Sequence, residues 1–192
     1  MPTPAAVAAT TPLATDRRRA VMASALITFA RFGYHKTSME QIAKAAHISR
    51  PGLYFLFASK EELFRDAVTQ SLEEDLNEVE RILGAKDRAL PERLLASFDC
   101  WAGRYVGPLA QDITRVIDDN PALLGDVVDT APRRFADLVF SSIAARAGRS
   151  EREAAAAITQ TMISASIGIK HQADDRAAYL ERMKVAIEVL LE

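Results

Sequence analysis

Four residues, Ser49–Gly52, have the types and the spacing to do chemistry, and that chemistry is the binding of an anion. Serine is a favoured N-cap, and proline is tolerated in the first turn of a helix because the amide it lacks would be unpaired there anyway. The four residues therefore open a helix rather than form a turn. The free amides at such a start carry partial positive charge that favours a phosphate, and the bare backbone of Gly52 would let a partner approach closely.

The remainder of the sequence shows no pattern typical of an enzyme, a metal site or a cofactor site. The histidines His35, His47 and His171 are scattered, and neither a serine–histidine–acid set nor a glycine-rich phosphate loop is present. No metal-ligand spacing such as HExxH occurs. The single cysteine, Cys100, cannot form an internal disulfide, which suits a reducing cytoplasm. We therefore expect a cytoplasmic protein that binds rather than catalyses, without a cofactor or metal.

Composition and charge allow a sizeable core and favour a polyanionic partner. The 192 residues are 49% hydrophobic and 26% charged, and no apolar run approaches the ~18–20 residues of a membrane span. Residues 1–15, uncharged and with three prolines, are expected to be a disordered tail. Residues 1–65 contain nine Lys or Arg and four Asp or Glu, a net charge of +5, whereas the rest contains 15 basic and 22 acidic residues, a net −7. A basic first third favours contact with nucleic acid, although chance clustering of solvated charges would give the same balance.

The elements that must position Ser49–Gly52 are helices. Apolar residues recur at three- and four-residue intervals over 16–32, including Ala23 and Ile27, and predict a first amphipathic helix. Gly33 is placed to end it in a left-handed conformation. A second helix is predicted to begin near residue 38, because two capping boxes fit there: Thr37 with Glu40, and Ser38 with Gln41.

The third helix, over about 50–57, has two faces. Leu53 and Phe57 share one face at i, i+4 and are expected to anchor the helix in the core. Arg50 and Tyr54 share another face by the same spacing and are expected to point outward.

A long helix follows, from a capping box formed by Ser59 and Glu62 to near Gly84. The two short helices, at about 38–57, are joined by a tight turn and supported by the first helix, which is the arrangement of a helix-turn-helix. In that motif the second helix fits the DNA major groove with its N-terminal residues at base edges. Residues 16–65 are therefore predicted to be a DNA-binding domain.

The run TSMEQIAKAAHISRPGLYFLFASKEELF closely resembles the DNA-binding signature of the TetR family of transcriptional regulators. The positions that carry the resemblance are Thr37–Ser38, Ile42–Ala43, Ser49, Leu53–Tyr54, Phe57 and Lys60–Leu63. The rest of the chain agrees with the family only in length and helicity. The resemblance implies an all-α homodimer, in which a long helix joins each N-terminal helix-turn-helix domain to a larger helical domain, residues 66–192, that dimerises and binds a small effector.

The resemblance also implies roles for individual residues. The implied contacts are with phosphates for Ser38, Tyr54 and Lys60, with base edges or a thymine methyl group for Arg50, Pro51 and Gly52, and with DNA more generally for Thr37, Ser49 and Phe55. Because a bidentate arginine discriminates guanine from other bases by about 1–3 kcal/mol, Arg50 is the expected base reader. Packing in the core is the alternative for Tyr54 and Phe55.

Two positions depart from the family pattern. His47 stands where the inter-helix turn usually has glycine, and histidine enters the left-handed region only with some strain. Leu56 stands where a histidine or tyrosine often touches the DNA backbone. These departures motivate an alternative hypothesis, a helical ligand-binding or interaction module that has lost DNA reading.

The remaining sequence predicts helices and no strands. Helix starts are indicated at Pro91, Asn120–Pro121, Ser150, and Asp174 or Asp175, with ends expected near Tyr105, Gly148 and Lys170, and Pro132 is expected either to start a helix or to kink one. An effector pocket would be lined by Phe98, Trp101, Tyr105, Ile113 and Ile117, for which plain core is the alternative. Contact with a second subunit is expected on two helices, at Phe135, Val139, Ile158 and Ala165.

The leading hypothesis is a sequence-specific transcriptional repressor, all-α and dimeric, that a small-molecule effector releases from a palindromic operator. The expected partners are double-stranded DNA, that effector and a second copy of the chain, with no membrane.

Overall fold

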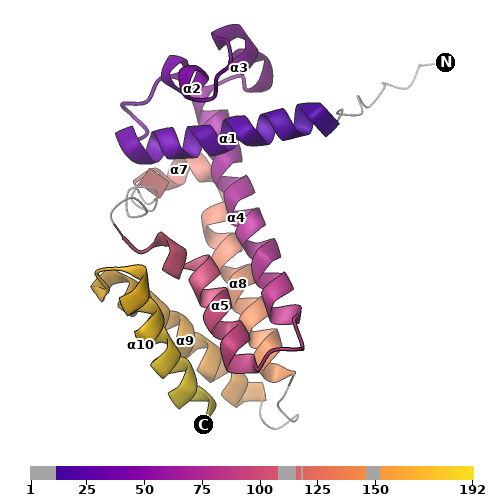
Figure 1. Ribbon diagram of the computed structural model, residues 1–192, viewed down its shortest axis with the longest axis vertical. Coiled ribbons are helices and arrows are strands. Elements are labelled where there is room, and N and C mark those ends of the chain that lie inside the picture. Colours follow the sequence, from indigo (N-terminus) through magenta and orange to yellow (C-terminus); the bar gives the residue numbers. More distant parts are fainter. Residues whose placement is uncertain (1–11, 108–115, 118, 146–151) are drawn as a thin grey trace, which may run out of the picture. The chain divides into compact units, whose positions relative to one another are not determined.

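The computed structural model describes residues 12–107, 116–117, 119–145 and 152–192, and every regular element in those residues is helical, as predicted (Figure 1). The chain divides into two compact units, Met1–Ala67 and Val68–Glu192. The elements are α1 (Pro12–Phe32), α2 (Met39–Ala45), α3 (Arg50–Leu56), α4 (Lys60–Gly84), α5 (Leu90–Trp101), the 3-10 turn η1 (Gly103–Tyr105), α7 (Pro121–Leu124), α8 (Val127–Ala144), α9 (Arg152–Gln172) and α10 (Arg176–Leu191).

The first helix differs from its prediction in both its start and its buried face. It begins at Pro12, so the expected tail is wrong for residues 12–15, which are helical because proline fits a first helical turn. Val21, Ala25 and Phe29, spaced by four residues, are almost wholly buried, whereas Ile27 is 67% exposed. The buried stripe is therefore rotated from the one that the sequence suggested.

Aromatic rings close the core of the first unit. Phe29 on α1 meets Phe64 on α4 edge-on, with ring centroids 5.1 Å apart, and Tyr34 lies 5.0 Å from Phe64 and 5.6 Å from Phe29. These contacts hold α1 against the start of α4, and α2 and α3 lie together on one side of α1 (Figure 1).

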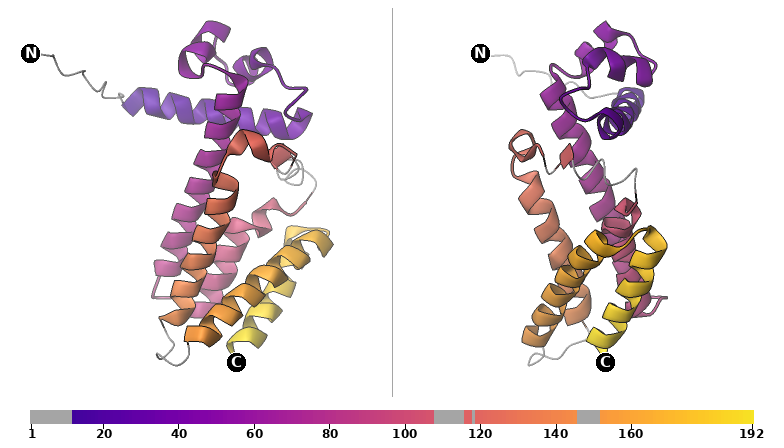
Figure 2. Two further views of the ribbon diagram at one scale, coloured as in Figure 1. Left: turned by 180° about the vertical axis from the view of Figure 1, so that it is seen from behind. Right: turned by 90° about the vertical axis from the view of Figure 1, so that its left-hand side faces the viewer.

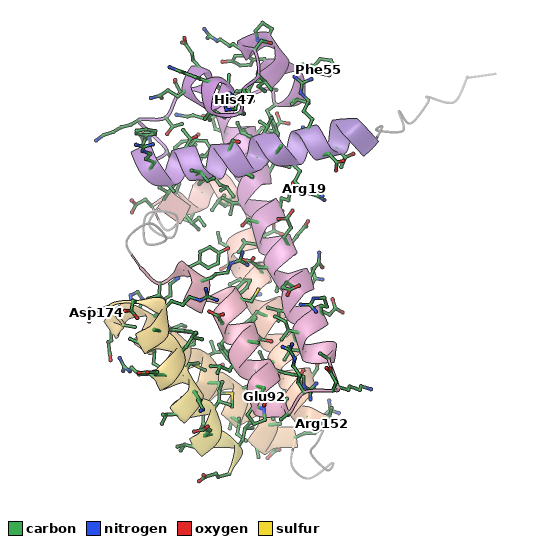
Figure 3. The ribbon with its side chains drawn as sticks, viewed as in Figure 1. Arg19, His47, Phe55, Glu92, Arg152 and Asp174 are labelled. Carbon is green, nitrogen blue, oxygen red and sulfur yellow. The ribbon has the colours of Figure 1, made fainter. Side chains whose placement is uncertain are left out.

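The predicted caps form at both short helices. Ser38 Oγ accepts from the Gln41 amide at 3.2 Å, and Gln41 Oε1 accepts from the Ser38 amide at 2.8 Å, which completes one of the two capping boxes proposed. His47, in the turn between α2 and α3, adopts φ of 53°, the left-handed conformation expected of it (Figure 3). Ser49 Oγ then accepts from the Gly52 amide at 3.1 Å and opens α3. The helix-turn-helix geometry thus follows the sequence closely.

In the second unit α9 and α10 lie side by side and run antiparallel, with α5 against α10 and α8 against α9 (Figure 2). Phe98, Phe135, Met162, Tyr179 and Met183 lie in their shared core. Asp175 caps α10 by accepting from the Ala178 amide at 2.8 Å, which decides between the two caps proposed.

Of the two possibilities given for Pro132, starting a helix or lying within one, the structure excludes the first. α8 begins at Val127, and Pro132 lies inside it rather than at its start. A proline in the second turn removes only one hydrogen bond of the ladder, which a helix with a buried face tolerates. The expected end at Gly148 and the expected cap at Ser150 lie outside the described residues.

Candidate nucleic-acid interface

The helix α3 has one buried face and one open face. Leu53 and Phe57 are 0% and 1% exposed, whereas Tyr54 and Phe55 are 44% and 89% exposed. The Arg50 guanidinium lies 5.7 Å from the centre of the Tyr54 ring, so the predicted outward pair is confirmed. Figure 3 shows Phe55 at the outer surface of α3. Core packing is thereby excluded for Tyr54 and Phe55, and α3 presents an arginine and two aromatic rings to solvent.

The start of α3 is tightly built around Gly52. Ser49, Arg50 and Pro51 are exposed there. A Cβ atom on Gly52 would lie 3.0 Å from Ser49 Oγ, the atom that caps the helix. Glycine is therefore favoured at this position by the cap itself, in addition to the close approach of a partner that the sequence suggested.

Thr37 does not face a partner, contrary to its place in the predicted DNA-binding set. Its side chain is buried, and its hydroxyl donates to the Gly33 carbonyl at 2.7 Å. The exposed neighbour Ser38 is the actual cap of α2. Of the two hydroxyl residues, Thr37 therefore holds the loop before α2, and Ser38 lies at the surface.

Lys60 is held by its own chain rather than extended to solvent. Its ammonium donates to the carbonyls of Tyr34 and Thr37, both at 3.1 Å, and lies 4.4 Å from the centre of the Tyr34 ring. The Lys60 ammonium is therefore not extended toward a phosphate, as the resemblance implied, but bonded to backbone carbonyls. Lys60 ties the start of α4 to the loop between α1 and α2, and a phosphate would have to use its third proton.

Arg18 is a positioning residue that the sequence did not reveal. Its guanidinium donates to the Leu56 carbonyl and to the Asp66 carboxylate, and it lies 3.8 Å from a carboxylate oxygen of Glu62. It also stacks 4.1 Å from the centre of the Phe57 ring. These contacts join α1 to the end of α3 and the beginning of α4. The run of three arginines gave no signal that distinguished Arg18 from its neighbours.

The residues expected to line an effector pocket are packed against one another or bonded within the second unit. Phe98 meets Phe135 edge-on at 5.2 Å between ring centroids, and Trp101 stacks on Phe135 at 4.9 Å. Ile117 is half-buried, and Ile113 lies outside the described residues. Phe98 and Trp101 thus pack against Phe135. The effector pocket itself stays a prediction.

Tyr105, the remaining member, belongs to a polar cluster around the buried Asp75. The carboxylate of Asp75 accepts from the Tyr105 hydroxyl at 2.6 Å and from Arg104 at 2.7 Å. Burial raises the pKa of Asp75, and burial together with the bond to Asp75 raises the pKa of Tyr105 to about 12. Burial also raises the pKa of the Cys100 thiol, which makes it a poor nucleophile.

The dimer residues predicted from the sequence are partly wrong. Phe135 and Val139 are 2% and 0% exposed and belong to the core of the chain itself. Ile158 and Ala165 are half-buried against the same core. The exposed aliphatic side chains of this unit lie elsewhere on α9 and α10, at Ile167, Val185 and Val189.

Two further functions find no support in the described residues. No three His, Cys, Asp or Glu side chains among them gather so as to hold a metal ion. None of the described helices combines the length and the apolar character needed to cross a bilayer.

An all-helical chain with an open recognition helix defines a helix-turn-helix protein, and the comparisons with known proteins agree. Residues 21–67 match the family "Bacterial regulatory proteins, tetR family". Residues 21–67 thus resemble the helix-turn-helix domain of the TetR family, and the fold of the chain is similar to that of solved proteins described as TetR-family regulators. The curated relatives and the solved structure from Mesorhizobium loti are described as transcriptional regulators.

Similarity in sequence is concentrated in the helix-turn-helix region. The chain is 40% identical to the HTH-type transcriptional regulator RutR of Escherichia coli over 57 residues, which cover 30% of this chain and 27% of RutR. It is 29% identical to the HTH-type transcriptional regulator YfiR of Bacillus subtilis over 126 residues, 65% of this chain and 51% of YfiR. The chain thus matches about a quarter of one curated relative and about half of the other.

Similarity in fold extends over nearly the whole chain. A Mesorhizobium loti protein described as a TetR-family transcriptional regulator superposes with a TM-score of 0.71 at 18% identity, over 92% of this chain and 96% of that one. The reduced form of Escherichia coli NemR superposes with a TM-score of 0.68 at 16% identity, over 91% and 95% of the two chains. These low identities establish a shared fold.

Proposed function

We propose that the protein is a sequence-specific DNA-binding transcriptional regulator that acts as a repressor. The observation that carries this proposal is the open face of α3, where Phe55 is 89% exposed beside Tyr54 and Arg50. A large apolar side chain so exposed on a helix anchored at Leu53 favours a partner surface. The similarity of the helix-turn-helix region to curated transcriptional regulators supports duplex DNA as that partner.

In the proposed complex α3 enters the major groove with its first residues at base edges. Arg50 pairs with guanine through two hydrogen bonds, and Pro51 and Phe55 contact thymine methyl groups. Tyr54 donates its hydroxyl to a phosphate, and the exposed cap Ser38 lies at the backbone beside it. The buried Thr37 is not part of this interface.

The operator is proposed to be palindromic because two copies of the chain bind together. The exposed residues Ile167, Val185 and Val189 on α9 and α10 support a second copy as the occupant of that surface. We expect Val185→Glu to reduce the dimer fraction in sedimentation velocity, because the interface would bury an unpaired charge. Glu40→Gln, which changes an exposed glutamate of the N-terminal unit, is the control. A wild-type chain that sediments as a monomer at every concentration would contradict the dimer.

Release from the operator by a small-molecule effector is proposed on the family resemblance. The effector must bind two conformations of the protein unequally, since a ligand with equal affinity for both shifts neither. A thermal-shift screen of a metabolite panel identifies it. A hit that raises the melting temperature and leaves operator affinity unchanged would contradict the release mechanism.

The proposed function is tested by selecting bound fragments from genomic DNA and titrating salt against the recovered sequence. We expect one sequence class with internal two-fold symmetry, and affinity that falls steeply as salt rises because phosphate contacts release counterions. Arg50→Ala is expected to relax the preference at one base position by about 1–3 kcal/mol. If no fragment is enriched, the alternative of a helical module that has lost DNA reading is favoured.

A further inference from the structure

Arg17 lies beside the start of α3, although it comes from α1. Its Nη2 atom lies 3.9 Å from the position that a Cβ atom on Gly52 would occupy. The side chain of Arg17 is exposed. Figure 1 shows the first half of α1 running past α3 within the N-terminal unit, which is the arrangement that brings the two residues together. The fold therefore delivers a second cation to the surface that α3 presents.

The charge of Arg17 is not neutralised by the part of the chain that the structure describes. No carboxylate among those residues lies within ion-pair distance of its guanidinium, and residues 1–11 contain no Asp or Glu. The next residue, Arg18, is the opposite case, because its guanidinium is bonded to Leu56 and Asp66. Two adjacent arginines thus have different tasks, one inside the fold and one at its surface.

We infer that Arg17 binds a backbone phosphate of the DNA half-site that α3 reads. The inference rests on the proposed DNA-binding function. A guanidinium presents its donors in a planar fork that matches the oxygens of a phosphate. Arg17 flanks the start of α3 from a different helix, where contacts fix the position of the reading helix on the duplex rather than read its sequence. It adds a cation to the interface that Lys60 does not supply, because the Lys60 ammonium is held by backbone carbonyls.

The test compares Arg17→Gln with Arg31→Gln in the full-length chain. Arg31 is also exposed on α1, and its replacement changes the net charge equally. It lies about 21 Å further along the helix at 1.5 Å per residue. Binding is measured by fluorescence anisotropy, as a function of salt, on the fragment recovered by selection and on an unrelated duplex of equal length.

We expect Arg17→Gln to weaken binding about eightfold at 0.1 M salt on both duplexes, and to lower the salt slope by about 0.9, the value for one lost phosphate contact. Arg17→Lys should retain the salt slope because it keeps the charge. The melting temperature of Arg17→Gln should equal that of the wild type, since no contact inside the fold is lost.

The outcomes separate this inference from the function on which it rests. A wild-type chain that binds neither duplex overturns both. If the wild type binds and Arg17→Gln matches Arg31→Gln in affinity and slope, the inference alone is overturned. A loss on the selected fragment without a loss on the unrelated duplex also overturns it, because a phosphate contact carries no base preference.

Discussion

The two units place the same kinds of side chain in opposite environments. In the N-terminal unit, α3 carries Tyr54 and Phe55 on its open face, and both are exposed. In the C-terminal unit, Phe98 and Trp101 lie three residues apart on α5, and both pack on Phe135 of α8. The difference lies in what stands opposite each helix. Spacing along a helix places residues on one face, and only the tertiary neighbours decide whether that face is covered.

Polar groups show the same contrast. The buried carboxylate of Asp75 in the C-terminal unit is satisfied by Tyr105 and Arg104 of its own chain. In the N-terminal unit Arg50 and Arg17 are exposed cations beside one helix start. Burial of an aromatic side chain is worth about 1.5–3 kcal/mol, so leaving Phe55 in water forgoes that stabilisation. The N-terminal unit therefore presents an open aromatic and basic surface, whereas the aromatic side chains of α5 pack against Phe135.

The largest expected effect is the loss of stability on removing a ring from the closed core. Phe98→Ala should lower the free energy of unfolding by about 3–5 kcal/mol, because it deletes a buried ring and leaves a cavity beside Phe135. Urea denaturation followed by the fluorescence of Trp101, the single tryptophan, reports on this unit directly. A loss below about 1 kcal/mol, the scale of a surface change, would mean that Phe98 borders an open pocket.

An intermediate loss of stability is expected at Lys60, whose ammonium is bonded to backbone carbonyls of the N-terminal unit. Lys60→Met keeps the aliphatic volume and removes two charged hydrogen bonds to carbonyls, each worth about 1.5–3 kcal/mol at most. We expect a lower melting temperature by circular dichroism and faster amide exchange in the loop before α2. Lys44→Met, at an exposed lysine of α2, is the matched control.

The salt slope of DNA binding distinguishes the two tasks that Lys60 could perform. If Lys60 positions the loop, the slope of Lys60→Met equals that of the wild type under conditions where both are folded. If the salt slope of Lys60→Met is lower than that of the wild type by about 0.9, Lys60 contacts a phosphate, as the family resemblance implied.

Local signals in the sequence predicted the helix-turn-helix well. The cap at Ser49 and the capping box of Ser38 depend on residues three positions apart, whereas the left-handed turn at His47 followed from the family resemblance. Such geometry is fixed by nearby side chains and backbone sterics, which a sequence displays directly. The inward pair Leu53 and Phe57 followed from the same local spacing.

Long-range partners explain what could not be predicted. The buried stripe of α1 was misassigned because its alanines fit several faces equally, and only the rings of Phe64 and Tyr34 select the face that carries Phe29. Lys60 meets carbonyls 26 and 23 positions away, and Arg18 meets Asp66, 48 positions away. No pattern of neighbouring residues indicates pairings of that kind.

The smallest expected change in stability is at Phe55, the exposed ring that most clearly distinguishes α3 from the covered helix α5. Phe55→Ala should alter the free energy of unfolding by no more than about 0.5 kcal/mol, because its ring is 89% exposed. The same variant should lose preference for thymine at one position of the selected sequence, since an apolar contact with the methyl group would be gone. Leu53→Ala, on the buried face of the same helix, should instead cost about 2–5 kcal/mol. Equal destabilisation by the two variants would show that the ring of Phe55 is covered in the folded chain, and α3 would then be as closed as α5.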